Sequence, residues 1–572
     1  MFSHTITRSR PRRPPPAVLA LVAVLVAGLV LRAWVVSRGW FYWDDLILLA
    51  QARESGLGDL LLRPHDGHLM PGSWLMIWLF AAAVEGLNWP AAVAALVVGQ
   101  TAAAGAVAYA AWRIRPQHAW WVTAIYLLIP LALPTSTWLA AAVNSLPLHT
   151  AAAVWLAHGW LHLTRGRTSD AVAAAAAVAA AGLFSERVVL LAPATLLLLL
   201  VWAPGARHRV TLAAGLLAPS VAWAGVYLAA VGDPRLPGGD PGSAGQLIAH
   251  GYLRAFLPTL AGGPWSWDRW HPGPPFAAPS APAVLAGLLA CAGLLWWAGR
   301  QCGGRGILAA GIVLAYPLLP FLALAVARSG GDTAAEITQT LRHFAEVSVP
   351  LALTCGVLAG RPGGRPGGWP GGLPRGRYLV ALVVLVVLTV SSLVSTAAYA
   401  RSWSQQPARE YFTTLNVGLA QREQPILDQA VPLEVLLPVA HPYNRLSALL
   451  GEPRISQVTS DPALADRHGN LVPAELFPLR ATGSEPGCAE GELAVPLDGP
   501  LLERDWVLRL NYLAENPGEA SVSLDGESVG FPVEQGLNQV HVSLHGGGDA
   551  LLVAADGLCL GRSEVGLLAP SR

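Results

Sequence analysis

Long apolar stretches separated by short polar loops fill the first 400 residues of the chain. Eleven of them are candidates to cross the ~30 Å hydrocarbon core of a membrane. They lie at 17–36, 90–112, 119–134, 149–163, 170–184, 188–203, 210–230, 282–299, 307–327, 346–360 and 378–399. No small-residue cleavage site follows the first stretch, so we interpret it as an uncleaved anchor. The pattern predicts an all-α polytopic membrane domain of about 11 transmembrane helices.

Arginines and carboxylates fall in alternate loops. One set of loops is short and nearly free of acid, and it holds an N-terminal cluster from Arg8 to Arg13, Arg113/Arg115, Arg165/Arg167, Arg207/Arg209, Arg300/Arg305 and Arg361/Arg365/Arg375/Arg377. The other set holds most of the carboxylates: Asp44, Asp45, Asp66, Glu186, Asp233, Asp240, Asp268, Asp332, Glu336 and Glu346. Because arginine-rich loops stay in the cytoplasm, we predict a multi-pass plasma-membrane protein with its N-terminus inside and its C-terminus outside.

A shorter apolar segment at 71–84 would invert this orientation if it crossed the membrane. We therefore predict that it is a helix on the outer surface, with a re-entrant hairpin as the alternative. The domains that follow are a cytoplasmic basic tail (1–16), a membrane domain (17–399) with a long first outer loop (37–89), and an extracytoplasmic C-terminal domain (400–572).

The C-terminal domain has a different pattern. A helix is expected at 407–421, and from about 490 apolar and polar residues alternate as in strands, at 506–510, 520–524 and 540–544, with turn residues between them. This predicts an α/β to β-sandwich-like module that binds carbohydrate or caps the membrane domain. Cys488 and Cys559 are its two cysteines. In an oxidising compartment we expect them to form a disulfide, with two unpaired buried thiols as the alternative.

Composition supports a membrane protein and excludes one class of partner. Only 13% of the 572 residues are charged, 53% are hydrophobic, and the net charge is +1. With no global positive field, no nucleic-acid partner is expected. The chain also contains no Gly-rich phosphate loop ending in Lys-Ser/Thr.

The acidic pair Asp44-Asp45 follows Trp40-Phe41-Tyr42-Trp43 just after the first apolar stretch. One aspartate suffices to cap the helix expected from Leu46, which leaves the other without a structural reason. A carboxylate at the membrane surface can act as a general base towards a hydroxyl. Two carboxylates could instead hold a divalent cation, Mg²⁺ or Mn²⁺, and this alternative stays open.

A second polar cluster, His65-Asp66-Gly67-His68, precedes Pro71. Two histidines and an aspartate could contact a substrate or ligate zinc, although a fourth zinc ligand is not evident nearby. The plain alternative is a turn whose polar residues fix the backbone.

Outer-loop arginines form the third group of candidates, with Arg187 next to Glu186, Arg254, and Arg342 next to His343. Each guanidinium could snorkel to the headgroups, and Glu186 and Arg187 could neutralise each other. Arginine is also the side chain best suited to grip a phosphate through two parallel hydrogen bonds. We predict that at least one of the three binds the phosphate of a lipid-linked donor.

These motifs resemble the GT-C membrane glycosyltransferases, which use polyprenyl-phosphate sugars. Trp43-Asp44-Asp45 is similar to the acidic pair of their first outer loop, and Gly67-His68-Leu69-Met70-Pro71 to a diverged form of the turn that follows it, without the double proline of better-known branches. Segments around Trp138, Asn144 and Pro147, and Gly262-Gly263-Pro264-Trp265, look similar to uncharacterised actinobacterial relatives.

The resemblance implies a glycosyltransferase that moves a hexosyl or pentosyl group to an extracytoplasmic glycan, lipid or protein. Asp44 or Asp45 would be the base, and Arg187, Arg254, Arg342 and His343 would bind the donor phosphate. His65, Asp66, His68, Asn144 and Trp265 would bind substrate or acceptor. Two alternatives remain, a lipid or polysaccharide transporter and a non-catalytic protein of the cell envelope. No internal repeat favours the transporter.

Overall fold

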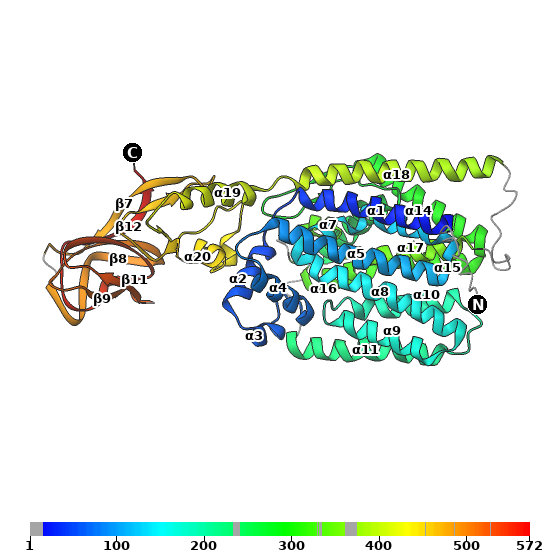
Figure 1. The fold of residues 1–572 in the computed structure, drawn as a ribbon, viewed down its shortest axis with the longest axis horizontal. Helices are drawn as coiled ribbons and strands as arrows, with labels where there is room; N and C mark the ends of the chain where they lie inside the picture. The colour runs from blue at the N-terminus through cyan, green and yellow to red at the C-terminus, as the bar shows by residue number, and fades with distance from the viewer. Residues whose placement is uncertain are drawn as a thin grey trace, which may run out of the picture. The chain divides into compact units, whose positions relative to one another are not determined.

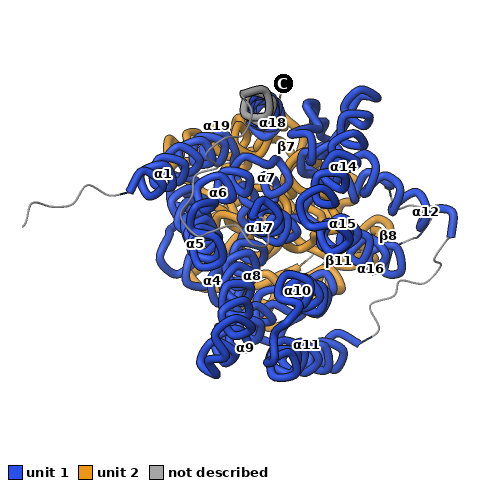
Figure 2. The backbone as a smooth tube through the Cα atoms, turned by 90° about the vertical axis from the view of Figure 1, so that its right-hand side faces the viewer, with its two compact units in different colours: residues 1–40, 51–405 blue, residues 41–50, 406–572 orange. Residues whose placement is uncertain are grey.

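The computed structural model describes residues 15–232, 241–328, 330, 334–360, 375–451, 453–484, 487–526 and 528–571. Two compact units make up the chain: unit 1 is Met1–Trp40 with Gln51–Gln405, and unit 2 is Phe41–Ala50 with Gln406–Arg572 (Figure 1, Figure 2). Most of the expected basic tail lies outside the described residues, as do the loop residues Asp233, Asp240, Asp332, Arg361 and Arg365.

Unit 1 is a bundle of helices. Within its described part, eight segments are long and apolar enough to cross a membrane: α1 (Pro16–Ser37), α5 (Trp89–Ile114), α8 (Leu139–Arg165), α11 (Arg209–Val231), α14 (Ala281–Cys302), Gly304–Arg328, Ala335–Leu358, and Leu382–Trp403 of α18 (Arg375–Trp403). Gly304–Arg328 comprises α15 (Gly304–Ala315) and α16 (Leu318–Arg328). Ala335–Leu358 comprises η4 (Ala335–Thr340), η5 (Ala345–Val347) and α17 (Ser348–Leu358).

Two shorter helical segments follow each other at Pro116–Leu128 and Pro130–Thr137, with an angle of 52° between them. The first contains α6 (Ala119–Leu128) and the second contains α7 (Leu133–Thr137). If the two segments are counted together as one bent span, the number of spans in the described part of the chain is nine. The remaining two predicted spans are the helices α9 (Thr168–Gly182) and α10 (Val188–Trp202), each of 15 residues. Fifteen residues rise only about 22 Å, less than the ~30 Å of a hydrocarbon core. The predicted polytopic helical class is confirmed, and within the described residues eight or nine of the eleven predicted spans are long and apolar enough to cross a membrane.

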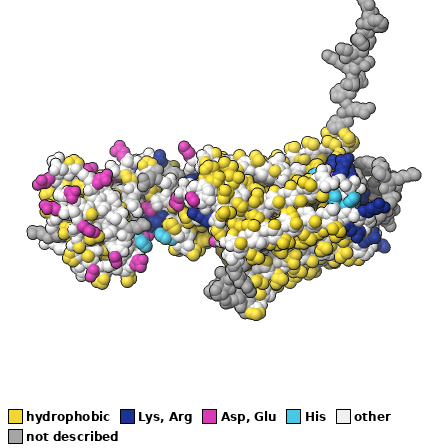
Figure 3. Space-filling model, turned by 90° about the horizontal axis from the view of Figure 1, so that it is seen from below, with side chains coloured by type: hydrophobic (Ala, Val, Ile, Leu, Met, Phe, Trp, Pro, Cys, Tyr) yellow, Lys and Arg dark blue, Asp and Glu magenta, His cyan; other side chains and the backbone are white. Residues whose placement is uncertain are grey.

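Small residues let these helices approach closely. A Cβ added to Gly99 of α5 would lie 2.9 Å from Leu146 of α8, and one added to Gly159 of α8 would lie 2.7 Å from Leu199 of α10. Such small residues at helix contacts are typical of membrane bundles. Large apolar side chains face outward instead, and hydrophobic side chains (yellow) cover much of unit 1 in Figure 3. On α18, Val386 and Val387 are 52% and 59% exposed.

The segment predicted to lie on the outer surface is the helix α4 (Pro71–Ala83). Its Ser73, Trp74 and Ile77 are buried against unit 1, whereas Leu75, Met76 and Leu79 are 39–52% exposed. At Gly72 an added Cβ would lie 2.7 Å from the Phe184 ring, and the Gly72 amide donates to the Leu183 carbonyl at 2.7 Å. The start of α4 is thereby fixed against the corner between α9 and α10.

Unit 2 combines helices with one long, curled sheet. The helices are α19 (Pro407–Ala420) and α20 (Leu446–Leu450). The sheet has the order β10-β9-β11-β8-β12-β7-β6, made from β6 (Ala463–Ala465), β7 (Leu471–Ala481), β8 (Gly487–Ala514), β9 (Gly518–Ser523), β10 (Val529–Val533), β11 (Gly536–Leu560) and β12 (Glu564–Pro570). The strands predicted at 506–510, 520–524 and 540–544 lie in β8, β9 and β11.

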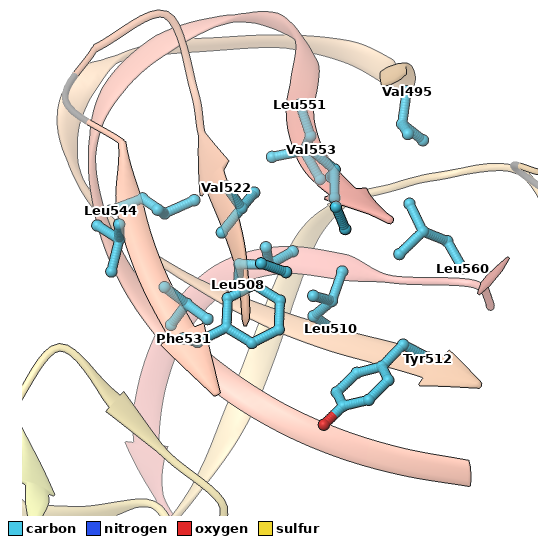
Figure 4. Close-up of a cluster of buried hydrophobic side chains, with 14 of the residues drawn as sticks. Val495, Leu508, Leu510, Tyr512, Val522, Phe531, Leu544, Leu551, Val553 and Leu560 are labelled. Carbon is cyan, nitrogen blue, oxygen red and sulfur yellow. The ribbon is translucent and has the colours of Figure 1, made fainter. Parts of the chain in front are cut away.

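The sheet bends round upon itself. Residues 558–560 of β11 pair both with 487–489 and with 512–514, the two ends of β8. Leu508, Leu510 and Tyr512 alternate inward along β8 and are at most 1% exposed (Figure 4). Between them, Arg509 and Asn511 are half-buried, and the next residue, Leu513, is 51% exposed. The period of two that predicts these strands therefore also builds the core of the unit.

Cys488 and Cys559 are joined by a disulfide between β8 and β11, with a sequence separation of 71 residues. Substituting Cys488 by Ser is expected to lower the free energy of unfolding of unit 2 by about 4 kcal/mol, because the bond restricts the unfolded chain over this long loop. Chemical unfolding of the full-length protein measures the effect. Cys355→Ser, which removes a free thiol from α17, is the matched control. Identical transitions for the two variants would contradict the expectation.

Candidate functional site

The residues His65-Asp66-Gly67-His68 form a tight hairpin. His65 and His68 exchange two backbone hydrogen bonds of 3.0 and 2.8 Å, and Asp66 and Gly67 both have positive φ, 47° and 79°. Asp-Gly is a preferred pair for such a two-residue turn. The Tyr227 hydroxyl on α11 donates to the Gly67 carbonyl at 2.7 Å. Asp66 and Gly67 therefore have a structural reason for their identity, and the two histidines flank the turn.

The two histidine rings have different neighbours. His65 packs edge-on against Trp74 of α4, with 6.0 Å between ring centroids. His68 Nδ1 lies 2.9 Å from Glu186 Oε1, at the corner between α9 and α10. The pair is partly open to solvent, since the side chains of His68 and Glu186 are 43% and 24% exposed. A partly exposed ion pair thus marks the surface of the site.

Glu186 and His68 shift each other's pKa. The charge of Glu186 raises the pKa of His68 above its ordinary value, against burial and against the charges of Arg187 and Arg328. Burial alone would raise the pKa of Glu186, but His68 and Arg187 outweigh it and lower that pKa to about 2. The pair is therefore an imidazolium–carboxylate pair at mildly acidic pH, and Arg328 lies within electrostatic range of it.

The stabilising effect of this pair depends on pH in a defined window. It is fully present between the ordinary pKa values of 4.5 for Glu and 6.5 for His. It is lost as pH rises through the raised pKa of His68, and also as pH falls towards the lowered pKa of Glu186. We expect the difference in unfolding midpoint between wild type and Glu186→Gln to be largest near pH 5.5 and to shrink above the pKa of His68. A difference that does not vary with pH would contradict the pair.

The centre of the site is a buried carboxylate that holds an arginine. Glu346 is 0% exposed and accepts from the Tyr316 hydroxyl at 2.8 Å and from Arg187 Nη1 at 3.1 Å. Arg187 Nη1 also donates to the Arg342 carbonyl at 2.7 Å. The Arg187 side chain is 18% exposed, so it joins this buried anchor to a partly solvent-accessible position. The sequence leaves open whether Arg187 pairs with its neighbour Glu186. In the structure its ion pair is with Glu346.

Arg342 lies in the same cluster. Its guanidinium carbon is 4.8 Å from the centre of the Trp138 ring, and its Nε is 3.4 Å from Nε2 of His343. The side chains of Arg342 and His343 are half-buried. The preceding residue, Leu341, has a φ of 61°, and the following Phe344 is buried against Phe256 and Phe321. A strained turn with a buried anchor thus positions the Arg342 guanidinium and the His343 imidazole.

We call this set the cationic cluster: His68, Arg187, Arg328, Arg342 and His343, with the carboxylates Glu186 and Glu346. Three arginines and an imidazolium exceed two carboxylates, so positive charge is left over. Glu186 and Glu346 orient His68 and Arg187 through these ion pairs but do not neutralise the whole positive charge of the cluster. The arrangement suits an anion with several oxygens, such as a phosphate.

The two aspartates of the acidic pair, Asp44 and Asp45, differ in how deeply their side chains are buried. Asp45 is 0% exposed, and its Oδ2 accepts from the Tyr42 amide at 3.3 Å while its own amide donates to the Tyr42 carbonyl at 3.0 Å. The Asp45 carboxylate thereby satisfies a backbone amide just before α2 (Asp44–Glu54), where the first amides of a helix have no partner within the helix. Asp44, the first residue of α2, is half-buried. The capping role thus falls on Asp45 and leaves Asp44 as the side chain to consider for chemistry.

Three further predicted residues lie elsewhere in unit 1. Asn144 on α8 accepts from the Ser73 hydroxyl of α4 and donates to the Ala140 carbonyl at 3.2 Å, so it ties α4 to the bundle. Arg254 is exposed on η3 (His250–Phe256), and no contact among the described residues joins it to the cationic cluster. Trp265 lies beside α18, where its indole N–H donates to Ser391 Oγ at 2.7 Å.

Sequence reasoning missed Tyr316 and gave Glu346 no role. Both lie in apolar stretches, where a single tyrosine is unremarkable and a carboxylate is costly unless paired. The energetic cost of an unpaired carboxylate could have identified Glu346 from the sequence, because an acid at the start of an apolar stretch needs a cationic partner. The sequence alone does not identify Arg187 as that partner, because 159 residues separate them.

No family model and no curated protein matches the chain. Among solved structures, it is similar to ArnT from Cupriavidus metallidurans bound to undecaprenyl phosphate, at 16% identity and a TM-score of 0.41, covering 76% of this chain and 84% of that one. It is also similar to the arabinofuranosyltransferase AftD from Mycobacteria, at 12% identity and a TM-score of 0.37, covering 96% of this chain and 58% of that one. The chain thus spans somewhat more than half the length of AftD.

Proposed function

We propose that the protein is an integral membrane glycosyltransferase. It moves a sugar from a polyprenyl-phosphate donor to a hydroxyl of an extracytoplasmic glycan, lipid or protein. The observation that carries this proposal is the cationic cluster of unit 1, where positive charge remains after two carboxylates are paired. The acidic pair and the turn after it supply the sequence resemblance to GT-C enzymes.

Arg342 is the residue we assign to the donor phosphate. Its guanidinium carbon lies 4.8 Å from the centre of the Trp138 ring, a cation–π contact that restrains the side chain. The planar guanidinium presents its donors as a fork that matches two phosphate oxygens. Arg187 is fixed by Glu346 and adds charge beside it. Together they stabilise the negative charge that grows on the leaving phosphate.

Asp44 is the proposed base. The acceptor oxygen attacks the anomeric carbon, the hydroxyl proton passes to the Asp44 carboxylate, and the bond between that carbon and the phosphate oxygen breaks. The electron pair leaves with the polyprenyl phosphate. Partial exposure of Asp44 and full burial of Asp45 support this assignment. Whether Mg²⁺ or Mn²⁺ takes part is tested by comparing transfer with and without EDTA.

Phosphate binding can be tested apart from catalysis. We expect Arg342→Gln to weaken the binding of undecaprenyl phosphate to the purified full-length protein about tenfold or more, because a charge-assisted hydrogen bond contributes ~1.5–3 kcal/mol. Arg254→Gln is the matched control, since it removes an exposed arginine outside the cluster. Equal affinities of the two variants for radiolabelled undecaprenyl phosphate in nanodiscs would contradict the assignment.

The alternatives give different results. A transporter would move a lipid-linked substrate between leaflets without breaking its phosphate ester. A non-catalytic envelope protein would bind its ligand without turning it over. In that case wild type and Asp44→Asn would both be inactive and would bind the ligand equally well.

A further inference from the structure

A separate pocket of about 330 Å³ lies in unit 1 beside the end of α18. Its walls come from the loop after α13 (Leu257–Leu260) and from residues 398–405. The side chains that matter here are Trp265, Trp267, Asp268, Arg269, Arg401 and Gln405. No residue of the cationic cluster lines it, so this pocket is a second place where a small ligand can bind.

The aromatic wall is locked onto α18. Gly262 has a φ of 82°, and a Cβ there would lie 2.7 Å from Ser391 Oγ, so only glycine lets the loop approach this closely. The Trp265 indole N–H donates to Ser391 Oγ at 2.7 Å, and the Trp267 indole N–H donates to the Ser395 carbonyl at 3.1 Å. Trp267 also packs edge-on against Tyr399, with ring centroids 4.9 Å apart.

The hydrogen bonds of their indole N–H groups distinguish Trp265 and Trp267 from tryptophans that anchor a protein at the membrane interface. An anchoring tryptophan directs its N–H to water or headgroups. Here both N–H groups are used inside the protein, yet both residues are only half-buried and both line the pocket. Trp265 also has a φ of 68°, which costs backbone energy for a bulky residue. What the loop offers to the pocket is therefore the apolar faces of the rings.

The other residues that line the pocket are mostly polar. Arg269 is 8% exposed, and its guanidinium donates to the carbonyls of Gly273 and Gln405 at 2.8 and 2.6 Å, so it stiffens the wall. Asp268, Arg401 and Gln405 are exposed. They supply a carboxylate acceptor, guanidinium donors and an amide that can do both.

We infer that this pocket binds a neutral saccharide. The C–H face of a sugar ring is apolar and packs on an indole, while its hydroxyls need both donors and acceptors when they leave water. The volume is at the small end of ligand pockets, which suits a short saccharide. The inference that the pocket binds a saccharide does not depend on the proposed function. The further assignment of this pocket as the acceptor subsite of the transfer reaction rests on the proposed function.

Saturation-transfer NMR on the full-length protein in nanodiscs tests this, with neutral methyl glycosides of glucose, galactose, mannose and arabinose as probes. We expect saturable binding of at least one glycoside, weakened about tenfold by Asp268→Ala. Glu85→Ala, which removes an exposed acid elsewhere in unit 1, should bind like wild type. Arg401→Ala is a second, independent variant with the same expected loss, in case Asp268→Ala disturbs the loop.

The result is separable from the transfer reaction. Asp44→Asn should still bind the glycoside although its sugar transfer is expected to be 10²–10⁴-fold slower, so a failed transfer assay leaves this test intact. Failure of all four glycosides to bind would overturn the inference. Equal affinities of Asp268→Ala, Arg401→Ala and Glu85→Ala would overturn it as well.

Discussion

Replacing Asp44 by Asn is expected to reduce sugar transfer by 10²–10⁴-fold, the usual contribution of a general base. Asn keeps the size and the half-buried position of the side chain but cannot take the proton of the acceptor hydroxyl. Initial rates with a polyprenyl-phosphate sugar donor measure the effect. Donor binding should stay within a few-fold of wild type, because phosphate binding is assigned to the arginines.

Asp45→Asn is the matched control for this prediction. Asp45 is fully buried and bonded to the Tyr42 amide, so its loss should lower stability more than it lowers the rate per folded molecule. If Asp45→Asn abolishes turnover in folded protein while Asp44→Asn does not, the roles of the two aspartates are reversed. Unchanged rates in both variants would remove the base from the mechanism.

Replacing Arg187 by Met is expected to lower the free energy of unfolding by about 3–5 kcal/mol. The change leaves the Glu346 carboxylate, which is 0% exposed, with the Tyr316 hydroxyl but without its charged partner. A buried charge without compensation is among the costliest defects in a fold. Thermal unfolding in a single detergent, compared with wild type, measures the loss.

The double variant Arg187→Met/Glu346→Leu separates structure from function. With both charges removed, most of the stability should return, since an apolar pair of similar volume can replace a buried ion pair. Binding of undecaprenyl phosphate should nevertheless stay weaker than in wild type, because the charge beside Arg342 is still missing. Full recovery of donor binding would show that Arg187 acts only through the fold.

The sequence predicts the elements of this protein better than the site. Apolar runs place a helix at each of the eleven predicted positions, although α9 and α10 are too short to pass as spans on length. The period of two in residues 506–510 predicts both a strand and its buried face. These are local patterns, and local patterns are what a sequence records directly.

The site depends on pairings between distant segments. Glu186 and Arg187 are neighbours in the chain, yet one pairs with His68 and the other with Glu346, because adjacent residues point in different directions. Asp66 looks like a ligand in the sequence, and the structure adds that it also forms a tight turn with Gly67. Pairing across more than a hundred residues follows from how the helices pack, which no local pattern encodes.

The most direct test is a transfer assay on the purified full-length protein in nanodiscs, with a panel of radiolabelled polyprenyl-phosphate sugars, each run with and without EDTA. The account predicts that at least one donor is consumed, that its sugar appears on an acceptor, and that Arg342→Gln and Asp44→Asn both slow the reaction. If no donor is bound or consumed by folded wild-type protein, the protein is not the glycosyltransferase proposed here.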